Sequence, residues 1–474
     1  MEVSGKNILV VGIARSGVAV ARLLAARGAT VTANDMKDES QLAREADELR
    51  QLGVRLALGG HPDDLFADAD LIVLSPGVPA DLPQLDMARG RAVEIISEPE
   101  LAGRFLRGRV IGITGSNGKT TTTALTGELM KAASAEVIVG GNIGTPLTSL
   151  IEQSNDATWT VAELSSFQLE MIDSLRVHVA VVTNITPDHL DRHGTFENYV
   201  SAKHRIFRNQ TARDFAVLNG WDKAIDEMVR ARGVQARRVY FSSQGPETIA
   251  GTAAGIYVRD GRLCTTMMAD HQDEVGVMAI ADIPLRGMHN VENVCAGLAA
   301  VFCAMQTRVT DLPALVAAIK QFPGVEHRIE YVTEINGVKF YNDSKATNVD
   351  STVKALEAFE HNLIVILGGK DKGSDYAILA PLVRERVKQI VLLGAASDKI
   401  AAQLEGVRPI KRAVSMQDAV HQSMAAAEAG DTVLLAPACA SFDMFDNYEH
   451  RGRVFKQEVK NLAGRMLSAA QRKE

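Results

Sequence analysis

Short apolar runs alternate with amphipathic helical stretches along the whole chain. The first run covers Asn7–Val11, a helical stretch continues to Arg27, and a second run covers Thr30–Asp35. Apolar runs of strand length that alternate with helical patterns are typical of βαβ units, in which the strands lie parallel in a buried sheet. The pattern therefore predicts an α/β protein built from parallel sheets.

The later apolar runs end in glycine, hydroxyl, amide or charged residues. In chain order these runs cover residues 70–74, 159–162, 178–183, 338–341, 363–367 and 432–435, and a further run begins at residue 109 and leads into a glycine loop. The carboxyl ends of parallel strands meet at one edge of a sheet, and ligands of such folds bind there. The polar residues that follow these runs are therefore candidate site residues.

The chain has 474 residues, which is more than one hydrophobic core supports. We expect three α/β domains: an N-terminal Rossmann-like domain over residues 1–97, a central phosphate-loop domain over 98–324, and a C-terminal Rossmann-like domain over 325–474. We also expect the prolines between residues 79 and 99 to break up the connection between the first two domains.

The composition indicates a cytoplasmic globular enzyme. Hydrophobic residues make up 46% of the chain and charged residues 23%. No apolar run approaches the ~20 residues that a membrane helix needs, and the N-terminus shows no signal segment. Four cysteines without a C-x-x-C pair indicate buried thiols in a reducing compartment. A net charge of -7 disfavours nucleic-acid binding.

Residues 109–123 combine an apolar strand, a glycine loop, a lysine and a run of threonines. Gly115 and Gly118 let the backbone turn its N–H groups inward, Lys119 adds a positive charge, and a threonine hydroxyl is offered to Mg²⁺ at the start of a helix. Ile113 stands where the standard P-loop pattern has its first glycine. The complete order of these features favours a nucleotide-phosphate site over a chance glycine loop.

The N-terminal βαβ unit carries an altered dinucleotide fingerprint. Ala14 replaces the second glycine of G-x-G-x-x-G, and Asp35 stands near the position of an acid that binds ribose. A nucleotide site is therefore favoured here, and a nicotinamide site is disfavoured.

Acidic and histidine side chains follow the strands of the central segment. Glu163 ends one run, where a carboxylate can take the Mg²⁺-binding role of a Walker B acid. His189 follows the next run. A single histidine more often has a structural role, but this one lies at a strand end of a phosphate-loop domain.

Tyr199 and Lys203 form the Y-x-x-x-K motif of short-chain dehydrogenases. That interpretation leaves the phosphate loop without a role and separates the motif from the βαβ unit, so we disfavour it. Further on, Asn290 and Asn293 share one helical face, from which they could contact a base or ribose.

Three loops of the last segment are rich in hydroxyl, amide and charged residues. They cover residues 342–348, 368–375 and 436–442, and two of them carry lysines. Any one of them could be an ordinary strand-to-helix turn with N-cap residues, but together they favour an anion-binding face.

The order of motifs resembles the bacterial Mur ligases along the whole chain. The motifs are T-G-S-N-G-K-T, G-N-I-G, E-L-S-S-F-Q-L-E, D-H-L-D-R-H, Y-x-x-x-K, H-N-x-x-N, H-R, N-D-S-K-A-T-N, L-G-G-K-D-K and A-P-A-C-A-S-F-D. The central motifs are shared with folylpolyglutamate synthases. The N-D-S-K-A-T-N and A-C-A-S motifs are similar to those of the D-glutamate-adding Mur ligases.

The resemblance implies an ATP-dependent amide ligase of peptidoglycan precursor synthesis. ATP would phosphorylate the carboxylate of UDP-N-acetylmuramoyl-L-alanine, and the amine of D-glutamate would attack the acyl phosphate, with release of ADP and phosphate. Because several anionic groups crowd together, catalysis would rest on positioning and on cations. We expect a monomer that does not insert into membranes.

The resemblance also implies roles for individual residues. The catalytic positions are Lys119, Glu163, His189, Lys203 and Lys345. The ligands of two Mg²⁺ ions are Thr120, Glu163, His189 and Lys203, the last as a carbamate formed with CO2. The ATP-binding positions are Gly115, Ser116, Asn117, Gly118, Lys119, Thr120, Thr121, Asn290, Asn293, Arg328 and Asp343. The substrate-binding positions are Ala14, Arg15, Asp35, Met36, Lys37, Ser75, Gly77, Asn142, Thr347, Lys372, Ser441, Phe442 and Tyr448.

Met36, Lys37 and Tyr448 differ from the residues that are usual in the family at these positions. The difference affects how uracil and D-glutamate would pack against the protein. Two alternatives stay open: another Mur-type or folylpolyglutamate-type amide ligase, and a nucleotide switch that hydrolyses ATP slowly without any dependence on an amino acid.

Overall fold

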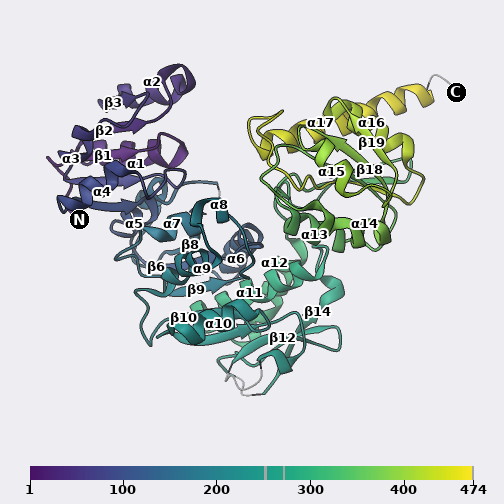
Figure 1. Cartoon of the computed structure of the whole chain (residues 1–474). Helices are drawn as coiled ribbons and strands as arrows, with labels where there is room; N and C mark the ends of the chain where they lie inside the picture. Colours follow the sequence, from purple (N-terminus) through teal and green to yellow (C-terminus); the bar gives the residue numbers. More distant parts are fainter. Residues whose placement is uncertain (143, 250–253, 271–272, 472–474) are drawn as a thin grey trace. The chain divides into compact units, whose positions relative to one another are not determined.

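The chain folds around three separate β-sheets, of five, nine and six strands in chain order. The computed structural model describes residues 1–142, 144–249, 254–270 and 273–471 (Figure 1). These residues form two compact units, one of Met1–Asp282 with Glu292–Phe322 and the other of Ile283–Val291 with Pro323–Glu474. The predicted α/β class with three sheet-based domains is confirmed.

The N-terminal sheet is parallel throughout, with the strand order β3-β2-β1-β4-β5. Its strands are β1 (Asn7–Val11), β2 (Thr30–Asp35), β3 (Arg55–Leu58), β4 (Leu71–Leu74) and β5 (Glu94–Ser97). Its helices are α1 (Arg15–Ala26), α2 (Ala43–Gln51), α3 (Asp63–Ala67), α4 (Pro83–Gly90) and α5 (Glu98–Gly103), with a 3₁₀ turn at Glu39–Gln41. The strand order reverses between β1 and β4, so the loops after these two strands flank a switch point, where such sheets bind ligands.

Two of the three prolines that were expected to break up the connection between the first two domains start helices instead, and Pro79 lies in the loop between β4 and α4. Pro83 begins α4, and Pro99 lies in the first turn of α5. The N–H groups of the first turn have no partner within a helix, and the fixed φ of proline suits this position. These prolines therefore start helices.

The central sheet is parallel from β7 to β12 and ends in two antiparallel strands. Its order is β14-β13-β12-β11-β10-β9-β6-β8-β7. The strands are β6 (Arg109–Thr114), β7 (Val137–Gly141), β8 (Trp159–Glu163), β9 (Val179–Val182), β10 (Phe215–Asn219), β11 (Arg237–Phe241), β12 (Gly255–Arg259), β13 (Arg262–Thr265) and β14 (Val275–Ala279). Every residue of β8 and β9 is buried, as expected of strands covered on both faces.

The helices of this region flank the parallel strands. They are α6 (Lys119–Ala132), α7 (Ser166–Glu170), α8 (Leu190–His193), α9 (Phe196–His204), α10 (Lys223–Arg232), α11 (Met288–Met305) and α12 (Leu312–Gln321). Short 3₁₀ segments lie at Leu147–Gln153, Arg205–Phe207, Pro246–Ile249, Ile280–Asp282 and Val309–Asp311. The described helices include none that is long and apolar enough to span a membrane.

The C-terminal sheet has the order β15-β16-β20-β17-β18-β19, with only the β15–β16 pair antiparallel. Its strands are β15 (Glu330–Ile335), β16 (Val338–Asn342), β17 (Leu363–Leu367), β18 (Val387–Leu393), β19 (Ile410–Ala413) and β20 (Thr432–Leu435). Its helices are α13 (Val349–Glu357), α14 (Ala380–Arg386), α15 (Ser397–Gln403), α16 (Met416–Ala426) and α17 (Tyr448–Gln471), with a 3₁₀ turn at Tyr376–Leu379. One apolar cluster covers each face of this sheet, which aligns the ends of β16, β17 and β20.

A buried carboxyl group joins the first two sheets. Glu98 at the start of α5 accepts hydrogen bonds from the backbone N–H and the hydroxyl of Thr148, at 2.7 and 2.9 Å. Burial raises the pKa of Glu98 from 4.5 to about 7, against the opposing effect of these hydrogen bonds. The Glu98 carboxyl group therefore binds its proton more tightly in the folded protein than in the unfolded chain.

Replacing Glu98 by glutamine removes this proton linkage. The stability that protonated Glu98 contributes is fully present below pH 4.5 and is lost as the pH rises to about 7. Over this pH range, we expect the free energy of unfolding of the native protein to fall by roughly 3 kcal/mol relative to that of Glu98→Gln. At higher pH, the two free energies should change with pH in parallel. The fluorescence of Trp159 and Trp221, the two tryptophans, reports unfolding of this unit.

The exposed Glu152, whose side chain is 83% accessible, supplies the control variant Glu152→Gln. The control should follow the native pH profile. Parallel profiles for the native protein and Glu98→Gln would contradict the linkage.

Candidate active site

The phosphate loop joins the end of β6 to the start of α6 in the central sheet. Gly118 caps the helix in the left-handed region, with φ of +84°. A Cβ at this position would overlap the side-chain oxygen of Asn293, so both the backbone and the available space require glycine. Asn293 also accepts a hydrogen bond from Thr122 at 3.2 Å. The predicted nucleotide residues Gly118 and Asn293 are therefore neighbours.

The segment after β9 forms hydrogen bonds with the phosphate loop. The backbone N–H groups of Ser116 and Asn117 donate to the carbonyl and side-chain oxygens of Asn184, at 2.9 and 2.8 Å. The Thr183 hydroxyl donates to the Asn117 carbonyl at 2.6 Å. Sequence reasoning assigned no role to Thr183 or Asn184, because their partners are almost 70 positions away.

Glu163 lies buried at the end of β8, paired in register with Ile113 of β6. Its Oε1 accepts a hydrogen bond of 2.7 Å from the amide of Asn142. Its Oε2 is buried without a hydrogen-bond partner. A buried carboxylate oxygen left without a partner is costly unless a cation or donor binds it. Glu163 therefore fits the predicted role of a Mg²⁺ ligand.

Two lysines donate to the same backbone carbonyl beside this acid. The Nζ atoms of Lys119 and Lys203 lie 2.9 and 2.7 Å from the Gly115 oxygen. Lys203, on α9, is 1% exposed, and its ammonium also lies 4.5 Å from the centre of the Tyr199 ring. Burial, and next the charge of Lys119, lower the pKa of Lys203 well below its ordinary value. The site thus favours a neutral amine at Lys203.

His189 and His193 flank the short helix α8 and have different surroundings. His189 has a left-handed backbone and a side chain that is 42% exposed, 3.6 Å from the carboxylate of Asp188. His193 is buried, shares a hydrogen bond of 2.9 Å with Ser166, and lies 3.1 Å from Glu170. Of the two histidines, His189 has the more exposed side chain, and its role as a metal ligand stays a prediction.

Sequence reasoning gave His193 no role of its own. The His193 ring stacks on the Phe167 ring, with 5.3 Å between the ring centres. The centre of the His189 ring lies 4.9 Å from that of the same Phe167 ring, in an edge-to-face arrangement. The spacing of the two histidines, one helical turn apart, was the available signal. His193 therefore helps to position the segment that carries His189.

In the N-terminal sheet, the predicted residues lie around the switch point. The carboxylate of Asp35 accepts from the backbone N–H groups of Ile13 and Lys37, at 2.7 and 3.0 Å. The Ser75 hydroxyl donates to the Gly12 carbonyl at 2.7 Å. Ala14, Arg15, Met36, Lys37 and Gly77 are exposed around these anchors. Asp35 and Ser75 thus fix the loops that the other predicted residues occupy.

A small pocket lies between this sheet and the central one. Its lining includes Ser75, Val78, Phe167, Glu170 and Arg192. The guanidinium of Arg192 donates to the Val78 carbonyl at 2.7 Å and lies 5.1 Å from the Phe167 ring. Arg192 belongs to a motif noted in the sequence but received no predicted role. The pocket adds a cationic group beside the predicted positions Ser75 and Gly77.

In the C-terminal unit, Asp343 and Lys345 follow β16. Asp343 is 2% exposed, and burial raises its pKa to about 6, opposed by the charge of Arg328. The ammonium of Lys345 lies 5.5 Å from the centre of the Tyr448 ring. Asn290 belongs to this unit as well, where its side chain donates to the Arg286 carbonyl at 2.7 Å.

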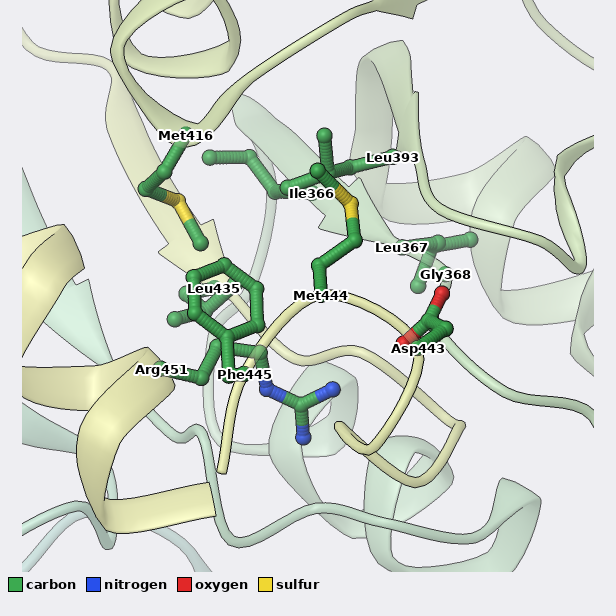
Figure 2. Close-up of a pocket in the computed structure, with 11 residues that line it drawn as sticks. Ile366, Leu367, Gly368, Leu393, Met416, Leu435, Asp443, Met444, Phe445 and Arg451 are labelled. Atoms are coloured by element: carbon green, nitrogen blue, oxygen red, sulfur yellow. The ribbon is translucent and has the colours of Figure 1, made fainter. Parts of the chain in front are cut away.

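Buried Arg451 of α17 holds two of the loops in this unit. It donates to the hydroxyl and carbonyl of Ser344, at 3.0 and 2.8 Å, and to the carbonyl of Cys439 at 3.1 Å. Figure 2 shows its guanidinium beside a small pocket, with Met444 and Phe445 on one side and sheet residues such as Ile366 behind. Arg451 therefore fixes the ends of β16 and β20 relative to each other.

The remaining predicted positions differ in exposure. Ser441 is 2% exposed and Phe442 is 68% exposed, although they are adjacent. Lys372 is exposed, and Thr347 is partly buried. Lys372 and Phe442 are thus the most exposed of these four predicted positions, and Ser441 is the most buried.

Comparison with known proteins gives the family. The model of the Mur ligase MurD-like N-terminal domain matches residues 6–97, that of the Mur ligase middle domain matches 113–301, and that of the Mur ligase glutamate ligase domain matches 327–439. These three matches follow the three sheets in order.

Full-length relatives support the same family. A UDP-N-acetylmuramoylalanine--D-glutamate ligase of Koribacter versatilis is 48% identical over 98% of this chain and 99% of its own length. One of Acidobacterium capsulatum is 47% identical, with 99% of each chain covered. The chain belongs to the Mur ligase family of enzymes, and the resemblance seen in the motifs is confirmed.

Solved structures share the fold at low sequence identity. A UDP-N-acetylmuramate-alanine ligase from Thermotoga maritima has a TM-score of 0.60 and 20% identity, with 96% of this chain and 99% of that chain covered. A pseudomurein peptide ligase from Methanothermus fervidus has a TM-score of 0.58 and 19% identity, covering 97% and 100%.

Gly118→Ala should impair nucleotide binding more than it impairs folding. A left-handed alanine costs roughly 1–2 kcal/mol, and here its methyl group also displaces Asn293. We expect at least a roughly tenfold weaker Kd for ATP, measured by calorimetry. Gly53, which follows α2, has φ of +75° and open space around it, so Gly53→Ala is the control for a positive φ without the clash. Equal ATP affinities of the two variants would contradict the role of the loop.

Proposed function

We propose that this enzyme joins D-glutamate to UDP-N-acetylmuramoyl-L-alanine at the expense of ATP, in peptidoglycan precursor synthesis. The curated relatives that carry this activity in their names align over nearly the whole chain. The observation that carries the proposal is the group of Lys119, Glu163 and Lys203 around the phosphate loop. This group combines a phosphate-binding cation with a buried acid whose second oxygen has no partner.

We assign one substrate to each segment of the chain. Residues 1–97 bind the UDP-linked substrate, 98–324 bind ATP, and 325–474 bind D-glutamate. The switch point of the first sheet suits a nucleotide diphosphate. The phosphate loop suits ATP, and the exposed lysine loops of the last sheet suit a dicarboxylate. The enzyme would act as a cytoplasmic monomer on these soluble substrates.

Lys119 and the N–H groups at the start of α6, with Thr120 and Thr121, would hold the β- and γ-phosphates of ATP. Residues of the C-terminal unit, Arg328 and Asp343, would bind the rest of the nucleotide. The substrate carboxylate then attacks the γ-phosphorus, ADP leaves, and an acyl phosphate forms. The free amine of D-glutamate attacks its carbonyl carbon, and phosphate leaves.

Mg²⁺ would be held by Thr120, Glu163, His189 and a modified Lys203. When bound, the ions neutralise the crowded phosphate and carboxylate oxygens during both steps. The donor set fits, since oxygen ligands dominate and Glu163 has an oxygen without a partner.

We propose further that Lys203 carries a carbamate. Its amine is held neutral by burial and by the neighbouring Lys119, and a neutral amine attacks CO2 with loss of one proton. The product would carry a negative charge close to Lys119 and could serve as an oxygen ligand for Mg²⁺. The repulsion that an ammonium would meet at this position is thereby replaced by attraction.

The first test measures phosphate release from ATP with Mg²⁺ and UDP-N-acetylmuramoyl-L-alanine. We expect release to require both this substrate and D-glutamate, since the acyl phosphate accumulates without an amine to accept it. L-Glutamate, L-lysine, meso-diaminopimelate and no amino acid are the controls. Release with another amino acid would change the assigned acceptor, and release that ignores every acceptor would contradict the ligase.

Lys203→Ala should lower kcat by at least about a hundredfold, because the carbamate carboxylate is lost from the metal site. Added formate or acetate should restore part of this activity, since a small carboxylate fits the volume that the side chain vacates. Lys203→Arg fills that volume with a permanent cation and should show no rescue. Full activity of Lys203→Ala without any added acid would refute the role of the carbamate.

A further inference from the structure

Two loops of the C-terminal unit are fastened to each other through their backbones. The loop after β17 carries Lys372, and the segment after β20 carries Ser441. The Gly368 N–H donates to the Pro437 carbonyl at 2.8 Å, and Lys370 and Ala440 exchange two backbone hydrogen bonds of 2.8 and 3.2 Å. The two loops therefore move as one element wherever these bonds hold.

A chain of three side chains adds a second connection. The hydroxyl of Tyr376, whose side chain is fully buried, donates to Oδ1 of Asp371 at 2.8 Å and lies 3.0 Å from Sγ of Cys439. The phenol has one proton, which goes to the carboxylate, so the thiol must donate its own proton to the phenol oxygen. Burial raises the pKa of Cys439 to about 11, which keeps the thiol protonated for this bond.

Lys399 and Gln403 of α15 anchor this chain of hydrogen bonds. The ammonium of Lys399 lies 2.8 Å from Oδ2 of Asp371 and 5.5 Å from the centre of the Tyr376 ring. The side chain of Gln403 accepts the Tyr376 N–H at 2.8 Å. Burial tends to raise the pKa of Asp371, but the bonds from Lys399 and Tyr376 outweigh it and lower the pKa, so this acid is an anion at neutral pH.

The segment that carries Ser441 also stores backbone strain. Ala438 has φ of +60°, a region that is unfavourable for a residue with a side chain, and its N–H donates to the Ala346 carbonyl at 2.9 Å. Strained positions of this kind persist only where surrounding contacts fix them. The thiol of the next residue, Cys439, makes such a contact with Tyr376.

We propose that Asp371, Tyr376 and Cys439 are positioning residues for the amino-acid substrate, which hold Lys372 and Ser441 at the spacing that D-glutamate requires. This inference rests on the proposed function. Asp371 precedes Lys372 directly, and Cys439 lies two positions before Ser441, so the hydrogen-bonded chain fixes the backbone on which both substrate residues stand. A dicarboxylate bound at two points is sensitive to small changes in their separation.

The test compares steady-state constants of full-length variants for each substrate in turn. Tyr376→Phe keeps the ring and removes the hydroxyl. We expect its KM for D-glutamate to rise about tenfold, while its KM values for ATP and the UDP-linked substrate stay within about twofold. Cys439→Ala should raise the KM for D-glutamate in the same way, and Cys439→Ser, which retains a donor, should restore a value near that of the native enzyme.

Tyr331, which is 54% exposed on β15, supplies the control variant Tyr331→Phe, expected to leave all three KM values unchanged. Thermal melting of each variant reports folding separately. A lower melting temperature with an unchanged KM for D-glutamate in Tyr376→Phe and Cys439→Ala would overturn the positioning role and leave the ligase standing. Native enzyme without any D-glutamate-dependent turnover would overturn the proposed function, and this inference with it.

Discussion

One backbone carbonyl, that of Gly115, accepts hydrogen bonds from two lysine side chains in a buried setting. Two ammonium groups that contact one carbonyl oxygen repel each other strongly where water is excluded. Burial, with the charge of Lys119 next, lowers the pKa of Lys203, which relieves the repulsion by favouring its neutral form. The adjoining Glu163 then faces one permanent cation and one reactive amine. The proposed phosphate and metal chemistry depends on this balance of charge.

A similar arrangement is found at each site: a partly or fully buried polar group from another segment holds a loop at the end of a parallel strand. Asn184 holds the phosphate loop, Asp35 holds the loop after β1, and Arg451 joins the ends of β16 and β20. Buried donors and acceptors are costly to leave unpaired, so each set of bonds has few alternatives. The loops can thus carry exposed side chains without losing their position.

The sequence predicted the strands closely, because buried parallel strands appear as continuous apolar runs. Asn7–Val11, Leu363–Leu367 and Thr432–Leu435 have the predicted bounds, and the run at residues 178–183 differs by one residue at each end. The prediction failed at Pro83, which begins a helix, because proline at a first helical turn and proline in a connection look alike in a single sequence. The site residues assigned from motifs stay predictions, although several of them are neighbours here.

By itself, the sequence determined the α/β class, the family and the order of the strand-end motifs, because periodicity and short motifs are local properties of the chain. Only the tertiary structure decided that Lys119 and Lys203 share one carbonyl, that one oxygen of Glu163 has no partner, and that Tyr376 joins Asp371 to Cys439. These relations join positions up to 88 residues apart. Burial and pairing depend on which strands become neighbours in a sheet, and no local pattern encodes that choice.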